Sequence, residues 1–105
     1  MSKFYVTCGA KSLVVNAESA ETAAMRLIDS TMAEHTWIYN DAELREQDRR
    51  DHIALEALLN LGTRVLVSER GTGRNDALEV GVPELLDEWH QLMTALSRLL
   101  AKINV

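Results

Sequence analysis

The chain has 105 residues, of which 47% are hydrophobic and 26% are charged, and its net charge is −5 at pH 7. This length suits one domain but not two, and this hydrophobic fraction is too high for a disordered chain. The acidic balance disfavours nucleic acid as a partner, because proteins that bind nucleic acid tightly present a basic face to the phosphates. No stretch approaches the ~20 consecutive apolar residues that a membrane span requires, so we expect no membrane partner.

The single cysteine, Cys8, excludes a disulfide within the chain. A chain without disulfides is typical of a reducing compartment. The first residues, Met1–Val6, also lack the long apolar stretch of a signal peptide. We therefore expect a cytoplasmic protein.

The N-terminal part of the chain predicts a β-hairpin followed by a helix. Apolar and polar residues alternate in Lys3–Cys8 and again in Ser12–Ala17, which is the pattern of half-buried strands. The short segment Gly9–Lys11 between them holds a glycine and suits a hairpin loop. Ser19 then marks the start of a helix, because its hydroxyl can accept a hydrogen bond from the free amides of the first turn. Apolar residues at helical spacing continue this helix over Ala20–Met32.

The middle of the chain leaves two assignments open. Thr36–Tyr39 is aromatic and β-branched, so it suits either a short strand or a packed loop. Asp41 can cap a second helix, whose first half, Ala42–His52, is almost wholly polar and fits either a solvated helix or a loop. The second half, Ile53–Leu61, is rich in apolar residues and precedes Gly62, a residue typical of a helix end.

The C-terminal part repeats the order of two strands and a helix. Thr63–Glu69 and Ala77–Val80 are predicted strands on either side of a glycine-containing loop, and Pro83–Ile103 is the strongest helical pattern in the chain. The whole predicts a single α+β domain over residues 1–105, with the order ββα-α-ββα. We expect a mostly antiparallel sheet of about four short strands, covered by helices on one face.

The predicted C-terminal helix carries more apolar surface than the predicted sheet can cover. At about 1.5 Å per residue the helix is ~31 Å long, whereas each strand spans only ~20 Å. The surplus is covered either by Ile53–Leu61 of the same chain or by a second copy, which would give a homodimer. The candidate interface residues recur in steps of three and four, and they are Trp89, Leu92, Leu96, Leu99 and Ile103.

The loop between the last two predicted strands is a candidate ligand site. Two arginines flank two glycines there, so guanidinium groups and exposed backbone amides could meet an anion or a nucleotide. Its glycine spacing fits neither a Walker loop nor a dinucleotide-binding loop, and a hairpin turn explains the glycines equally well. The residues are Arg70, Gly71, Thr72, Gly73 and Arg74.

Signs of catalysis or metal binding are weak in the sequence. Cys8 falls on the inward face of its strand, where a thiol packs as a small apolar group. The histidines His35, His52 and His90 include no pair four residues apart and match no zinc-ligand spacing. We therefore predict no catalytic residue, metal ligand or cofactor. The expected function is a non-enzymatic interaction module that binds itself or another protein, and the alternative is a small anion- or nucleotide-binding regulatory domain.

Overall fold

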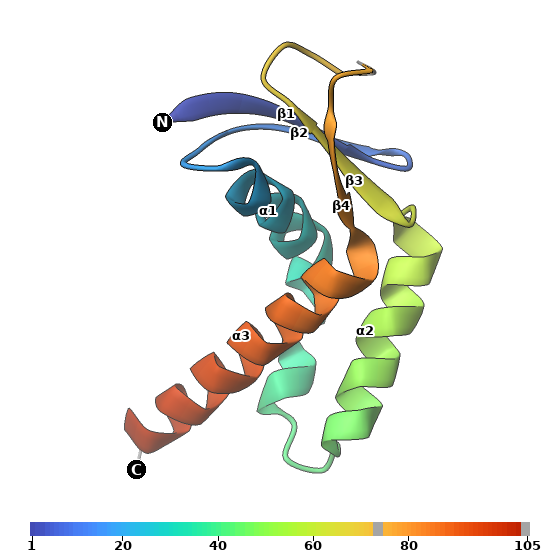
Figure 1. Ribbon diagram of the computed structural model, residues 1–105. Helices are drawn as coiled ribbons and strands as arrows, with labels where there is room; N and C mark the ends of the chain where they lie inside the picture. The colour runs from blue at the N-terminus through green and yellow to red at the C-terminus, as the bar shows by residue number, and fades with distance from the viewer. Residues whose placement is uncertain (73–74, 104–105) are drawn as a thin grey trace.

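The computed structural model describes residues 1–72 and 75–103, which form a four-stranded antiparallel sheet, three α-helices and one 3-10 helix (Figure 1). The strands are β1 (Ser2–Cys8), β2 (Lys11–Ala17), β3 (Arg64–Ser68) and β4 (Leu78–Gly81). The helices are α1 (Ala20–Met32), η1 (Ala33–Asn40, the 3-10 helix), α2 (Glu46–Asn60) and α3 (Val82–Ile103). The predicted α+β class and the order ββα-α-ββα are confirmed.

The strand order in the sheet is β2-β1-β3-β4, so the two hairpins meet along β1 and β3. Val6 stands opposite Leu13 in β2 and opposite Val67 in β3, which places three apolar side chains in one row across the sheet. Because strand residues alternate between faces, this register directs Phe4 and Cys8 to the same face as Val6. All three are buried, as the alternation in the sequence predicts.

The three α-helices lie on this one side of the sheet, and α1 covers it (Figure 1). α1 packs against every strand, and α3 packs against α1, β4 and η1. The small side chains Ala23 and Ala24 are fully buried and allow α1 to approach the sheet closely. α1 begins where the sequence predicts, since the Ser19 hydroxyl accepts a hydrogen bond from the Thr22 amide at 3.1 Å.

The structure resolves the two open assignments in the middle of the chain. Thr36–Tyr39 forms neither a strand nor an irregular loop, because it lies within the 3-10 helix η1. The polar segment 42–52 is divided, with a turn up to Arg45 and helix α2 from Glu46 onward. This boundary has a local cause: the Asp48 carboxylate accepts a hydrogen bond from the Arg45 amide at 3.0 Å and so caps the first turn.

Helix α3 extends well beyond the sheet. In Figure 1 it starts beneath β4 and runs diagonally to the C-terminal end at the lower left, far from the strands. The 22 residues of the helix give the molecule an elongated form of 47 × 29 × 19 Å. In the part of the chain that the structure describes, no helix combines the length and the apolar character needed to cross a membrane.

Candidate functional site

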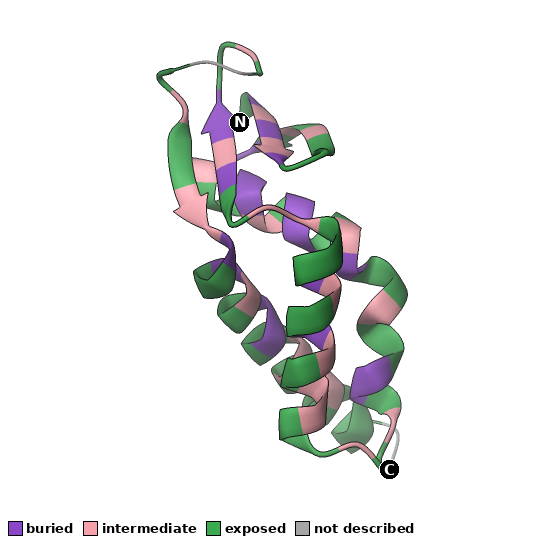
Figure 2. Ribbon diagram, turned by 90° about the vertical axis from the view of Figure 1, so that its right-hand side faces the viewer, coloured by how far each residue is buried: buried purple, intermediate pink, exposed green. Residues whose placement is uncertain are grey.

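The apolar stripe of α3 is buried in its first half and exposed in its second half. Trp89 is only 1% exposed and lies in the core, so it is not available at the surface. Further along the same stripe the exposed fractions rise to 56% for Leu92, 47% for Leu96, 55% for Leu99 and 67% for Ile103. Figure 2 shows this change from buried to exposed along the helix. Four of the five residues predicted for an interface are therefore uncovered by their own chain.

Three contacts join α3 to α1 and η1. The Trp89 indole donates a hydrogen bond to the Asp29 carboxylate of α1 at 3.2 Å and packs edge-on against Tyr39. Two turns further, the Ser97 hydroxyl donates to the Tyr39 carbonyl at 2.7 Å. The face of α3 that bears Ser97 therefore packs against the end of η1, whereas Leu96 and Leu99 on the stripe remain exposed.

Helix α2 does not cover the surplus surface either. It contacts α3 near the start of that helix, where Arg50 forms an ion pair with Asp87 at 3.0 Å. Its own apolar side chains Leu55, Leu58 and Leu59 are largely exposed. Of the two alternatives, cover of the surplus surface by Ile53–Leu61 is therefore contradicted by the structure. The buried residues of α2 are Ile53 and Ala57, and they face the core.

Charge is distributed unevenly along α3. Glu84, Asp87 and Glu88 occupy its first two turns, whereas Arg98 and Lys102 lie near its end. Glu88, Arg98 and Lys102 form no ion pair with any described residue. The exposed apolar half of α3 thus follows an acidic segment and itself carries two basic residues.

A groove of about 470 Å³ separates α2 from the start of α3. Its walls are mainly apolar and include Leu58, Leu61 and Leu86, and His90 also lines it. His90 is 3% exposed, and its Nδ1 is hydrogen-bonded to the Tyr39 hydroxyl at 2.9 Å. Its Nε2 lies 3.6 Å from a Glu46 carboxylate oxygen and has no hydrogen-bond partner among the described residues. Burial, followed by the nearby positive charge of Arg50, lowers the pKa of His90, so the imidazole is neutral at pH 7.

The glycine loop is only partly described, because Gly73 and Arg74 lie outside the described residues. Gly71 has a positive φ of 145°, which explains the glycine by backbone geometry. Arg70 forms an ion pair with Asp76 at 3.8 Å, so its charge is already partly compensated. Arg70, Gly71 and Thr72 line neither the groove above nor the polar hollow described below.

The Cys8 thiol is enclosed in the core and donates to the Gly62 carbonyl at 3.7 Å. Burial raises the pKa of this thiol. A nucleophilic cysteine requires a lowered pKa and access to substrate, and Cys8 has neither.

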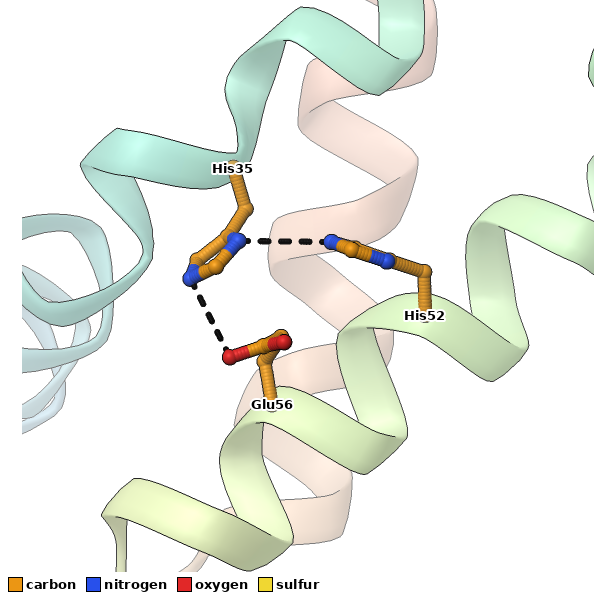
Figure 3. A group of neighbouring side chains, drawn as sticks. All are labelled: His35, His52 and Glu56. Atoms are coloured by element: carbon orange, nitrogen blue, oxygen red, sulfur yellow. Dashed lines mark hydrogen bonds and ion pairs between the residues drawn. The ribbon is translucent and has the colours of Figure 1, made fainter.

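The structure brings together three residues that the sequence analysis did not combine: His35 of η1 with His52 and Glu56 of α2 (Figure 3). His52 and Glu56 are four residues apart, which places them on one face of a helix, and this spacing was a readable signal. The position of His35 beside His52 and Glu56 depends on the packing of η1 against α2, and no local sequence pattern predicts that packing.

In comparisons with protein-family models, curated proteins and solved structures, none matched this chain.

Proposed function

We propose that this protein is an interaction module that forms a homodimer by antiparallel pairing of the second half of α3. The observation that carries the proposal is the continuous stripe that is core up to Trp89 and exposed from Leu92 to Ile103. Large apolar side chains gathered on one helix face are costly to leave in water, and burial against another apolar face removes that cost.

A second copy of the same helix complements this surface in its apolar pattern and in its charge. In an antiparallel pair centred near Leu96, Leu92 of one copy stands opposite Leu99 of the other. A register shifted by one residue brings the acidic Glu88 opposite the basic Lys102 of the second copy at both ends of the contact. A two-fold interface requires such self-complementarity, because each residue must find its partner in the same surface.

The size of the contact indicates a reversible dimer. The stripe from Leu92 to Ile103 is ~18 Å long, and stable interfaces bury about 800 Å² per partner. The area that two such helix halves can bury against each other lies at the lower end of that range. The equilibrium between monomer and dimer should therefore depend on concentration in a measurable range.

Sedimentation velocity from low micromolar to millimolar concentration tests the proposal. The wild-type chain should shift from monomer to dimer, and the double variant Leu96→Glu, Leu99→Glu should stay monomeric with an unchanged far-UV circular dichroism spectrum. The matched control is Leu55→Glu, Leu59→Glu, which adds the same charge to exposed positions of α2 and should still dimerise. A wild-type chain that is monomeric at every concentration contradicts the proposal.

A charge-exchange cycle tests the antiparallel register. Glu88→Lys and Lys102→Glu should each weaken the dimer by placing like charges together, and the double exchange should restore it. No restoration in the double variant would contradict this register.

Two further expectations stay predictions from the sequence. The lone, buried cysteine supports a cytoplasmic location. Anion binding by Arg70–Arg74 remains the alternative function, and the ion pair between Arg70 and Asp76 does not favour it.

A further inference from the structure

His35, His52 and Glu56 converge between η1 and α2 (Figure 3). The His52 Nε2 lies 3.3 Å from the His35 Nδ1, and the His35 Nε2 lies 3.3 Å from a Glu56 carboxylate oxygen. One ligand atom from each residue can be chosen so that all three lie within 4.8 Å of one another. The His35 and Glu56 side chains are only 20% and 23% exposed, so the cluster is held inside the protein surface and not on a freely solvated face.

The surroundings hold these three side chains in place. Arg49, on the same helix as His52, donates hydrogen bonds to the Ile38 carbonyl at 2.9 Å and to the Asp41 carbonyl at 2.7 Å. These bonds fasten η1 to α2 and so bring His35 to its position. The Trp37 ring packs edge-on against the His52 ring, with the ring centroids 5.8 Å apart.

The Glu56 carboxylate has a second partner besides His35. The Asn60 side-chain amide donates to the Glu56 backbone carbonyl at 2.8 Å and lies 3.5 Å from its carboxylate. A hydrogen-bonded carboxylate has fewer orientations available. In metal sites, such outer partners fix the direction of the ligand atoms.

A polar hollow of about 310 Å³ opens beside the cluster. His35 and Glu56 form part of its wall, and Lys11, Ser12 and Glu34 line it further away. A group bound between the two histidines and the glutamate would therefore have one side turned to water or to a small polar molecule.

We propose that His35, His52 and Glu56 form a binding site for a divalent transition-metal ion of the zinc class. Two imidazoles and one carboxylate are a donor set that Zn²⁺ prefers, with a fourth position left for water. Hard cations such as Mg²⁺ and Ca²⁺ prefer sites built of oxygen ligands, which this cluster does not supply. The fourth position faces the polar hollow.

Binding requires a small contraction of the cluster. With bonds of about 2.1 Å in a tetrahedron, the ligand atoms stand ~3.4 Å apart, so the widest pair must close by ~1.4 Å. Rotation of the side chains supplies this distance without a change in the backbone. His35 then exchanges its two hydrogen bonds for one coordinate bond, and His52 and Glu56 turn toward the same point.

Titration of the untagged 105-residue chain with ZnCl₂ by isothermal calorimetry tests the site. We expect one Zn²⁺ per chain, no heat beyond dilution with MgCl₂ or CaCl₂, and shifts of the imidazole carbon-bound protons of His35 and His52 in NMR spectra. The variants His52→Ala and Glu56→Gln should each weaken Zn²⁺ binding by at least roughly tenfold. Loss of an outer-shell partner typically weakens metal binding by about 10- to 100-fold, and these two residues are proposed as direct ligands. Glu56→Gln keeps the shape of the side chain, so its effect is informative even if His52→Ala folds poorly.

Matched controls separate this site from adventitious surface binding. Asp51→Asn removes a carboxylate from the adjacent position of α2, and His90→Asn removes the histidine outside the cluster; both should bind Zn²⁺ as the wild type does. CoCl₂ should quench the fluorescence of the wild type through Trp37, and Trp37→Phe should lose most of this quenching.

The proposal is overturned if Zn²⁺ does not bind, if Mg²⁺ binds equally well, or if Glu56→Gln and Asp51→Asn lose the same affinity. All ligands come from one chain, so the monomeric variant Leu96→Glu, Leu99→Glu should bind Zn²⁺ unchanged, whatever the fate of the dimer.

Discussion

Arg49 is the side chain that joins the 3-10 helix to α2. It donates to the backbone carbonyls of Ile38 and Asp41, at 2.9 and 2.7 Å. Hydrogen bonds from a charged group contribute more than neutral ones, and their loss leaves both carbonyls without this partner. We expect Arg49→Ala to lower the free energy of unfolding by about 2–3 kcal/mol, measured by urea denaturation followed with far-UV circular dichroism.

Arg45 supplies the control for this prediction. Its side chain is 83% exposed and pairs with Asp48, three residues away. Exposed pairs of this kind contribute little, so Arg45→Ala should change the free energy of unfolding by less than about 0.5 kcal/mol. Equal effects of the two substitutions would mean that the Arg49 bonds are not what fastens η1.

His90 makes stability depend on pH. Burial holds its pKa below the ordinary value of 6.5, and Arg50 lowers that pKa further, against the opposing effects of Glu46 and Asp87. The unfolded chain therefore takes up this proton at a higher pH than the folded chain does. As the pH falls below about 6.5, the free energy of unfolding should decrease, whereas above this pH the contribution of His90 is constant.

The comparison of wild type with His90→Asn isolates this effect, because the two proteins differ only at this residue. Asparagine does not titrate, and its side chain can keep a polar atom near the Tyr39 hydroxyl. The variant should be less stable than the wild type at pH 7.5, and its stability should fall less between pH 6.5 and pH 5. Urea denaturation at a series of pH values measures this, and parallel curves would show that His90 is not the group responsible.

Helix α3 is one element with two energetic roles. Leu85 is 4% exposed and packs in the core, whereas Leu96 on the same stripe is 47% exposed. Truncation of a buried leucine leaves a cavity and costs about 2–5 kcal/mol. We expect Leu85→Ala to destabilise the monomer by this amount and Leu96→Ala to cost less than about 1 kcal/mol, with both measured by thermal unfolding at concentrations below dimer formation. A large loss for Leu96→Ala under these conditions would show that the second half of α3 is packed within the monomer.

At the scale of elements, local patterns predicted most of the fold. The alternation in β1 and β2, the cap at Ser19 and the helical spacing after Pro83 each act within a few residues, so the sequence displays them directly. The strand order depends on which hairpin edges meet, and η1 depends on the hydrogen bonds from Arg49. Such contacts join residues distant in the chain and leave no periodic trace. The same reason explains why His35 could not be placed beside His52 and Glu56, although the last two share a helix face.

The whole molecule is held together partly by one close contact between its two halves. Gly9 in the first hairpin lies against Gly62 at the end of α2, and a Cβ on Gly9 would stand 3.1 Å from the Gly62 amide nitrogen. Gly9 also has a φ of +59°, in the left-handed region that side chains disfavour. The Cys8 thiol donates to the Gly62 carbonyl at the same place. The Gly62 amide nitrogen belongs to the backbone, so it cannot move aside as the end of a flexible side chain can.

Substitution at Gly9 should therefore disturb the joint between the halves and not only a turn. The left-handed conformation alone costs a residue with a side chain about 1–2 kcal/mol, and the contact with Gly62 adds to this. We expect Gly9→Ala to lower the free energy of unfolding by about 2 kcal/mol or more. Gly81→Ala is the matched control, since its Cβ would meet only the movable end of the Glu84 side chain, and its φ is not positive. Urea denaturation of both variants decides the matter: if Gly81→Ala costs as much as Gly9→Ala, the approach of Gly9 to Gly62 does not determine how the two halves fit.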